Sequence, residues 1–229
     1  MNFVLHFELA RREDAGGDLC VALGATLPDL YRMASRRVRA TGRPGPELAR
    51  ELARLQRGVE HHLEADAWFH RTEVFVEGER ALRRDFAAIG AHRLPLFAHA
   101  AWEMCLDGAL LRRDGERALE QLAGVIASER RHVHALALAH GVPPDIEQAF
   151  AARLERLLDV VATGALPRGY ARAPGLSERV GGMRAAFGLP LPSETQRTAL
   201  EDALALALER ADEALPRLFE ARASARSSS

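Results

Sequence analysis

The amino-acid sequence predicts an all-α protein, on three observations. Strand signals are sparse, and only a short stretch from Val74 to Gly78 alternates apolar and polar residues. Apolar residues instead recur at helical spacing, in segments bounded by Pro and Gly. The chain has 229 residues, of which 48% are hydrophobic and 28% charged, enough to bury a full core. Because no repeat of fixed period is visible, we expect a helical bundle, with 1–222 as a single domain and 223–229 as a flexible tail.

Helix-breaking residues set the expected helix boundaries. Pro44, Gly45 and Pro46 precede the first helix that carries a polar motif, which extends through His70. A second such helix follows Pro95 and ends at Asp114–Gly115. Ser193 and Gln196 form a capping-box pattern at the start of the last helix. Further helices are expected over 115–140, 145–163 and 176–187, with a Pro- and Gly-rich connector over 167–174.

The composition excludes several classes of partner. Formal net charge is −1, with 31 basic and 32 acidic residues, so no global field attracts nucleic acid or an anionic membrane. Cys20 and Cys105 are far apart in apolar surroundings, which predicts free thiols and a reducing compartment. The N-terminal segment lacks the basic start of a secretory signal, and no apolar run is long enough to span a bilayer. We expect a cytoplasmic protein without nucleic-acid or membrane partners, and its oligomeric state stays open.

The first motif-bearing helix carries His62, Asp66 and His70 at intervals of four residues. This spacing places the three side chains within an arc of about 80° on one side of a helix. Val59, Leu63 and Phe69 flank them on the helical wheel, whereas Glu60 and Glu64 fall roughly opposite. A stripe of ligand-type residues on the apolar side indicates a metal site, although a narrow solvated stripe has the same spacing.

The second helix carries His99, Glu103 and Asp107 at the same intervals. Between Leu94 and Leu111 these are its only ionisable residues, and apolar side chains cover its remaining directions. Such a helix is buried, and a buried carboxylate needs a cation, a hydrogen-bond donor or a metal. Imidazoles and carboxylates on neighbouring helices are the ligands from which bundle cores build Mn, Fe or Zn sites.

Two residues outside the stripes are candidates to join them. His6 lies in an apolar N-terminal segment, and Asp29 lies where a helix begins after Pro28. Alone, each is better explained as a hydrogen-bonding core residue or an N-cap. Together with the stripes they extend the predicted metal-ligand set, which is His6, Asp29, His62, Asp66, His70, His99, Glu103 and Asp107.

Four segments resemble the acyl carrier protein phosphodiesterase family, helical hydrolases related to HD-domain phosphohydrolases. They are MNFVLHFELA, LGATLPDL, GVEHHLEADAWFH and FAHAAWEMCLDGAL, which occur in the family's order over about the first half of the chain. The resemblance implies an HD-domain-like fold, phosphodiester cleavage with a Mn-type divalent metal, and a metal site at or next to His6, Asp29, His62, Asp66 and Glu103. Leu63, His70 and Glu103 depart from the family's pattern and favour a sister group with another substrate.

The function expected from the residues and the resemblance is metal-dependent hydrolysis of a phosphoester, on a small molecule or a carrier protein. A divalent Mn, Fe or Zn ion would activate water, with Asp66 and Asp29 as the catalytic carboxylates. Arg71 or Arg93 would hold the phosphate. Two alternatives stay open: a non-hydrolytic carboxylate and histidine metalloprotein, and a helical interaction module without metal.

Two structural consequences are expected from this interpretation. The two motif-bearing helices should pack with their stripes facing each other. With several carboxylates converging, removal of the metal should raise at least one carboxyl pKa. The metal-free protein would then be less stable at neutral than at mildly acidic pH.

Overall fold

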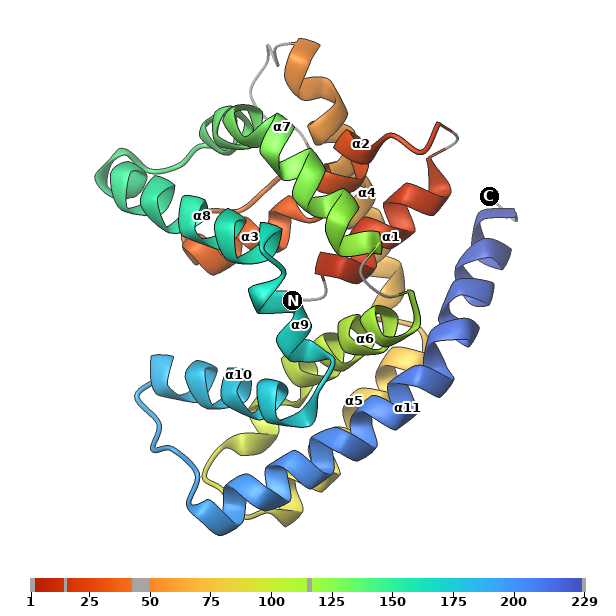
Figure 1. The fold of residues 1–229 in the computed structure, drawn as a ribbon, viewed down its shortest axis with the longest axis vertical. Coiled ribbons are helices and arrows are strands. Elements are labelled where there is room, and N and C mark those ends of the chain that lie inside the picture. The colour runs from red at the N-terminus through yellow and green to blue at the C-terminus, as the bar shows by residue number, and fades with distance from the viewer. Residues whose placement is uncertain (1–2, 15, 43–49, 115–116, 228–229) are drawn as a thin grey trace. The chain divides into compact units, whose positions relative to one another are not determined.

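Every regular element is helical in the computed structural model, which describes residues 3–14, 16–42, 50–114 and 117–227. The predicted all-α class is confirmed. The α-helices are α1 (Phe3–Glu13), α2 (Leu19–Gly24), α3 (Leu27–Ala34), α4 (Ala53–Phe69), α5 (Glu73–Ala88), α6 (Ala98–Asp114), α7 (Arg117–Ala139), α8 (Glu147–Ala162), α9 (Ala165–Tyr170), α10 (Ala173–Ala186) and α11 (Glu194–Ser227) (Figure 1). Short 3-10 helices, η1 (Arg50–Leu52), η2 (Leu94–Phe97) and η3 (Pro144–Ile146), precede α4, α6 and α8.

Several helix boundaries follow the local signals in the sequence. The predicted capping box opens α11, because the backbone N–H of Gln196 donates to the Ser193 hydroxyl (3.2 Å) and that of Ser193 to the Gln196 side chain (3.0 Å). The second motif-bearing helix ends at Asp114, as expected. Pro44, Gly45 and Pro46 lie outside the described residues.

Other boundaries differ from the expectation. The alternating stretch from Val74 to Gly78 lies inside α5, whose buried Val74, Phe75, Leu82 and Phe86 follow helical spacing. The connector expected over 167–174 contains most of α9 and the start of α10. Helix α11 continues to Ser227 and so includes 223–227 of the segment expected to be a flexible tail.

The contacts divide the chain into two compact units, each built from two or more separate segments. The first, which we call the α1 unit, contains residues 2–68 and 115–166. The second, which we call the α6 unit, contains residues 69–114 and 167–229, with residue 1. Each unit is described on its own below.

Helix α1 lies in the core of the α1 unit. Its residues from Phe3 to Ala10 are all buried, including the polar His6 and Glu8. It contacts α2, α3 and α7, while α7 and α8 form a helical hairpin that also contacts α2 and α3 (Figure 1). The Tyr31 hydroxyl on α3 donates a hydrogen bond to the Val133 carbonyl on α7 (2.8 Å), which ties these helices together inside the core.

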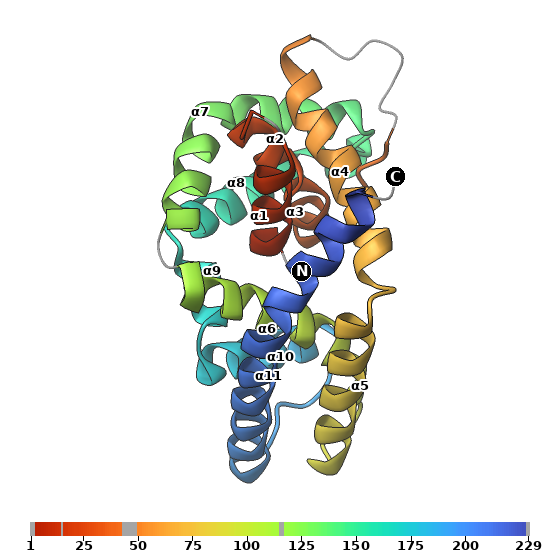
Figure 2. The same cartoon turned by 90° about the vertical axis from the view of Figure 1, so that its right-hand side faces the viewer.

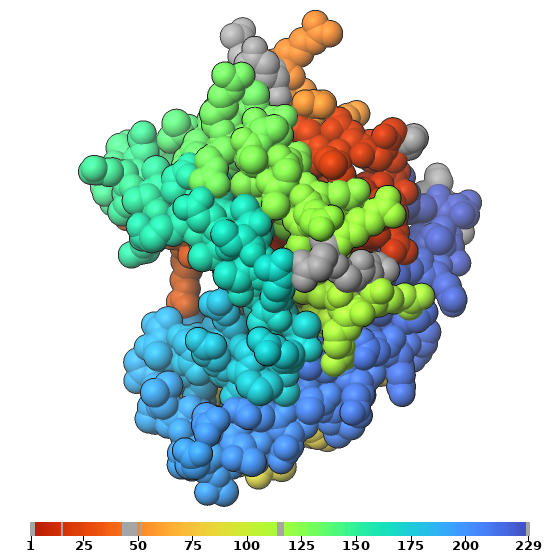
Figure 3. Space-filling view, viewed as in Figure 1, coloured from red at the N-terminus to blue at the C-terminus, as the bar shows by residue number. Residues whose placement is uncertain are grey.

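In the α6 unit, the long helix α11 contacts α5, α6 and α10 (Figure 2). Helix α6 is buried at every position from Ala101 to Leu111, as its apolar composition predicts. Helix α10 and α11 form a continuous surface on one face (Figure 3). Close approach between α5 and α6 depends on Gly78, because a Cβ there would lie 2.0 Å from the Trp102 indole.

Candidate metal centres

Two groups of three ligand-type side chains converge within the described part of the chain, and either group could hold a metal ion. We call His6, His62 and Asp66 the His6 cluster, and His70, His99 and Glu103 the His99 cluster. In each group, one potential ligand atom per residue lies within 4.8 Å of the others. The His6 cluster belongs wholly to the α1 unit and the His99 cluster wholly to the α6 unit.

The His6 cluster joins α1 and α4. The imidazole rings of His6 and His62 lie 4.0 Å apart between centroids, and His6 Nε2 lies 3.8 Å from the Asp66 carboxylate. His6 is only 1% exposed, yet neither of its ring nitrogens has a hydrogen-bond partner among the described residues. Because an unsatisfied buried polar group costs about 1 to 3 kcal/mol, this geometry calls for a further partner such as an ion.

Two glycines set the position of His62. A Cβ on Gly58 of α4 would lie 2.1 Å from the Val21 carbonyl oxygen, and one on Gly24 of α2 would lie 2.1 Å from that of Leu55. Only glycine permits this approach of α4 to α2. One turn after Gly58, His62 Nδ1 lies 2.8 Å from the Ala25 carbonyl oxygen. A carbonyl can only accept, so Nδ1 carries the proton and the Nε2 lone pair is left to bind a cation.

The electrostatics of the His6 cluster keep His62 neutral at physiological pH. Burial lowers the pKa of His62 to about 4, and His6 acts in the same direction, against the smaller opposing effect of the Asp29 and Asp66 carboxylates. Neutral imidazole is the form that binds metal. Asp66 is different, because 41% of its side chain is exposed, so one side of the cluster is open to solvent.

The His99 cluster joins the turn after α4 to α6. The rings of His70 and His99 stack at a centroid distance of 4.8 Å with only 4° between their planes. Both Nε2 atoms approach the same Glu103 oxygen, at 3.5 Å from His70 and 3.3 Å from His99. Glu103 is almost fully buried, whereas His70 and His99 are partly exposed.

The His99 cluster contains one carboxylate and two imidazoles, and not the several carboxylates that were expected to converge. Burial raises the pKa of Glu103, but neighbouring cationic groups, His99 among them, outweigh it and lower that pKa to about 2. Glu103 and then Glu79 raise the pKa of His99 against the effect of burial. The pKa of Glu103 is therefore lowered, whereas removal of metal was expected to raise the pKa of at least one carboxyl group.

The structure divides the predicted ligand set between the two clusters. Helix α4 ends at Phe69, so His70 lies in the following turn and joins His99 and Glu103 instead of the stripe of His62. The first stripe is thus divided between the two groups, and the His99 cluster combines residues of both stripes. Asp29, in the first turn of α3, lies outside the His6 cluster, although its charge acts on His62. Asp107 is completely buried on α6 and lies outside both groups.

Sequence reasoning missed the contribution of Glu79 on α5, whose carboxylate lies 3.5 Å from His99 Nδ1. The helical spacing of the apolar residues after Thr72 could have identified a helix that carries Glu79. The short alternating stretch from Val74 to Gly78 obscured this spacing. His61, next to His62 on α4, lies outside both clusters: it is largely buried and pairs with Glu13 at 2.9 Å. Arg71 and Arg93, proposed to hold phosphate, are both exposed residues of the α6 unit.

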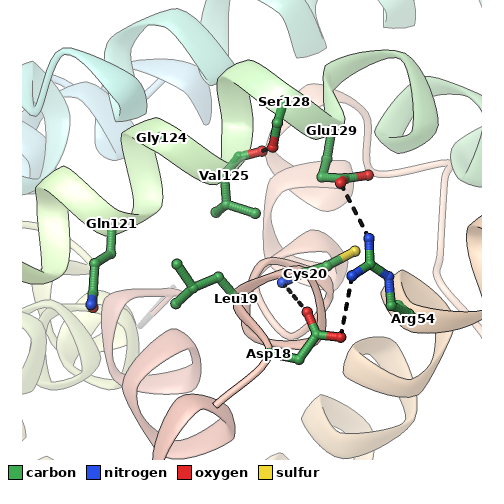
Figure 4. Close-up of a pocket in the computed structure, with 9 residues that line it drawn as sticks. All are labelled: Asp18, Leu19, Cys20, Arg54, Gln121, Gly124, Val125, Ser128 and Glu129. Carbon is green, nitrogen blue, oxygen red and sulfur yellow. Dashed lines mark hydrogen bonds and ion pairs between the residues drawn. The ribbon is translucent and has the colours of Figure 1, made fainter. Parts of the chain in front are cut away.

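A pocket of about 350 Å³ lies elsewhere in the α1 unit, between α2, α4 and α7 (Figure 4). Arg54 bridges Asp18 and Glu129 there, at 3.5 Å from each. Cys20 lines the pocket, but burial raises the pKa of its thiol to about 11, which disfavours the nucleophilic thiolate. None of the predicted ligand residues lines this pocket, so the two histidine clusters remain the candidate sites.

Comparison with known protein families, curated proteins and solved structures finds no match. In the described part of the chain, no helix has the length and apolar character needed to cross a membrane.

Proposed function

We propose that the chain is a divalent-metal-dependent phosphohydrolase or phosphodiesterase that acts at the His6 cluster. The observation that carries this proposal is the buried His6 ring, which faces Asp66 and His62 without a hydrogen-bond partner among the described residues. A cation among these three side chains would satisfy His6 and use the free Nε2 of His62. The phosphoester substrate class is supported by the resemblance of the four sequence segments to a phosphodiesterase family.

The donor set favours a first-row transition metal. Two imidazoles and a carboxylate suit Mn, Fe or Zn, whereas Mg and Ca prefer sites made of oxygen ligands. When bound, such an ion polarises a phosphoryl oxygen and lowers the pKa of a coordinated water. The exposed side of Asp66 leaves room for water and substrate, as in metal sites that have three protein ligands and an open position.

The remaining residues have distinct roles in this proposal. Ala25 orients His62 through its carbonyl oxygen, and Asp66 binds the ion through its carboxylate. Asp29 supplies a second carboxylate whose charge reaches His62, and it would accept a proton from the attacking water. The substrate would be a small phosphoester or a phosphorylated carrier protein.

The test compares two acids on helix α4. Asp66→Asn keeps the shape of the side chain and removes its charge, and should weaken Mn binding by about 10- to 100-fold or more. Glu60 is exposed and accepts a hydrogen bond from Gln56, so Glu60→Ala should change stability by about 0.5 kcal/mol and leave metal binding unchanged. Metal affinity and Mn-dependent hydrolysis of bis-p-nitrophenyl phosphate are measured for both variants.

The outcomes separate a hydrolase from a non-hydrolytic metalloprotein. Loss of Mn binding and hydrolysis in Asp66→Asn alone supports the hydrolase. Metal binding without hydrolysis, particularly of iron with a redox-active spectrum, favours a non-hydrolytic metalloprotein. If Asp66→Asn binds metal and hydrolyses substrate as the unaltered protein does, the His6 cluster is not the active centre.

A further inference from the structure

The His99 cluster offers three potential donor atoms that lie within 4.8 Å of one another. Nε2 of His70 and Nε2 of His99 lie 3.5 and 3.3 Å from one Glu103 oxygen. Charge-assisted hydrogen bonds between nitrogen and oxygen are shorter, about 2.7 to 2.9 Å. Metal–ligand bonds of about 2.0 to 2.2 Å in a tetrahedral site place neighbouring ligand atoms about 3.3 to 3.6 Å apart. The two histidine–glutamate distances match those between metal ligands, and all three donor atoms lie within 4.8 Å of one another.

Other histidine–carboxylate pairs of the chain provide an internal comparison. His132 lies 2.7 Å from Glu129, and His61 lies 2.9 Å from Glu13. Both distances are those of direct hydrogen bonds. The longer separations in the His99 cluster therefore do not reflect a general looseness of such pairs in this protein.

The surroundings hold the two imidazoles in place. Phe75 packs edge-on against both rings, at centroid distances of 4.4 Å from His70 and 5.0 Å from His99. Thr72 fixes the turn that carries His70, because its hydroxyl donates to the Phe69 carbonyl (2.7 Å) and accepts from the Phe75 N–H (3.2 Å). The ring positions are thus set by packing and backbone geometry before any ion binds.

Glu79 completes the arrangement from α5. Its carboxylate lies 3.5 Å from His99 Nδ1, on the opposite side of the ring from Glu103. A carboxylate at the outer nitrogen of a metal-binding histidine keeps the proton there and directs the other lone pair at the ion. The α5–α6 contact at Gly78 and Trp102 places these two glutamates next to the same imidazole.

We propose that His70, His99 and Glu103 form a second divalent-metal site, separate from the His6 cluster, with Glu79 orienting His99. Two imidazoles and one carboxylate select a Zn-like ion over Mg or Ca. The side chain of His99 is 45% exposed, so a water molecule can occupy a fourth position. This proposal does not depend on hydrolysis at the His6 cluster, because the two groups share no ligand.

The test counts ions and locates them with variants. The purified full chain, stripped by chelation, is titrated with Co²⁺ while its visible absorption and bound metal are measured. We expect two ions per chain in the unaltered protein, and one in each of His99→Ala and Asp66→Asn. Glu103→Gln should behave as His99→Ala does, and Glu79→Gln should weaken the second site by about 10- to 100-fold. His92→Ala, which removes an exposed imidazole of the same unit, should bind both ions.

Each outcome bears on the proposal. If His99→Ala loses one ion and Asp66→Asn loses the other, a separate second site is supported, whether or not the protein hydrolyses phosphoesters. If His99→Ala binds as many ions as the unaltered protein, the cluster is an imidazolium held between two carboxylates and the proposal is overturned. Loss of both ions in either single variant would also overturn it, by showing one shared centre. Far-UV circular dichroism of the metal-free variants checks that each is folded.

Discussion

Replacing Gly58 by Ala tests whether the close contact between α2 and α4 builds the His6 cluster. The new Cβ would lie 2.1 Å from the Val21 carbonyl oxygen and 2.6 Å from Gly24 Cα, and both distances are well short of the 3.4 Å at which ordinary contact begins. These atoms belong to the backbone, so no side-chain rotation relieves the overlap. Helix α4 must therefore move away from α2, and with it His62, whose Nδ1 lies 2.8 Å from the Ala25 carbonyl.

Two opposing effects set the size of the change in stability. Overpacking of a rigid contact costs about 3 kcal/mol, at the upper end of the usual range. Alanine recovers about 1 kcal/mol because it favours helix more than glycine does. The net loss is about 2 kcal/mol, which lowers the melting temperature of a chain of this length by about 4 to 8 °C. Displacement of His62 should also weaken metal binding at the His6 cluster by about 10-fold or more.

Gly124 on α7 supplies the matched control. A Cβ there would meet nothing within 4 Å, so Gly124→Ala should raise stability by about 0.5 to 1 kcal/mol and leave metal binding unchanged. Thermal melting of the metal-free proteins and Mn titration measure both effects. If Gly58→Ala melts at or above the unaltered protein, as Gly124→Ala should, the reasoning from this contact is refuted.

Two further predictions concern pH and helix capping. Because the pKa of His62 falls from 6.5 to about 4 on folding, the metal-free protein should lose about 3 kcal/mol of stability as pH falls from about 6.5 towards 4, the reverse of the trend expected from crowded carboxylates. Denaturant melts of the chelated protein at a series of pH values measure this loss of stability. His62→Gln should abolish the loss. A stability that does not change with pH in the unaltered protein would contradict the prediction. Thr72→Ala removes the N-cap of α5 and should cost about 1 kcal/mol, with weaker Co²⁺ binding at the His99 cluster. Ser193→Ala removes the cap of α11 at similar cost, so an equal effect of both variants on Co²⁺ binding would show that Thr72 does not position His70.

The local part of the structure could be predicted from the sequence. Helical spacing and the near absence of strand signals predicted the all-α class. The capping box at Ser193 and Gln196 predicted the start of α11, because both hydrogen bonds of that motif lie within four residues. The pairs His62 with Asp66 and His99 with Glu103 could also be identified, since residues four apart on a helix face the same way.

Only the tertiary structure decided which third residue joins each of these two pairs. His6 meets His62 and Asp66 because glycine contacts set the approach of α4, and a contact between residues far apart in sequence leaves no periodic signal. His70 has the spacing of the first stripe, but α4 ends at Phe69 and the turn held by Thr72 directs it to His99 and Glu103. Helix periodicity fixes the direction of a side chain only relative to its own helix. Packing between helices therefore divided one predicted ligand set into two clusters.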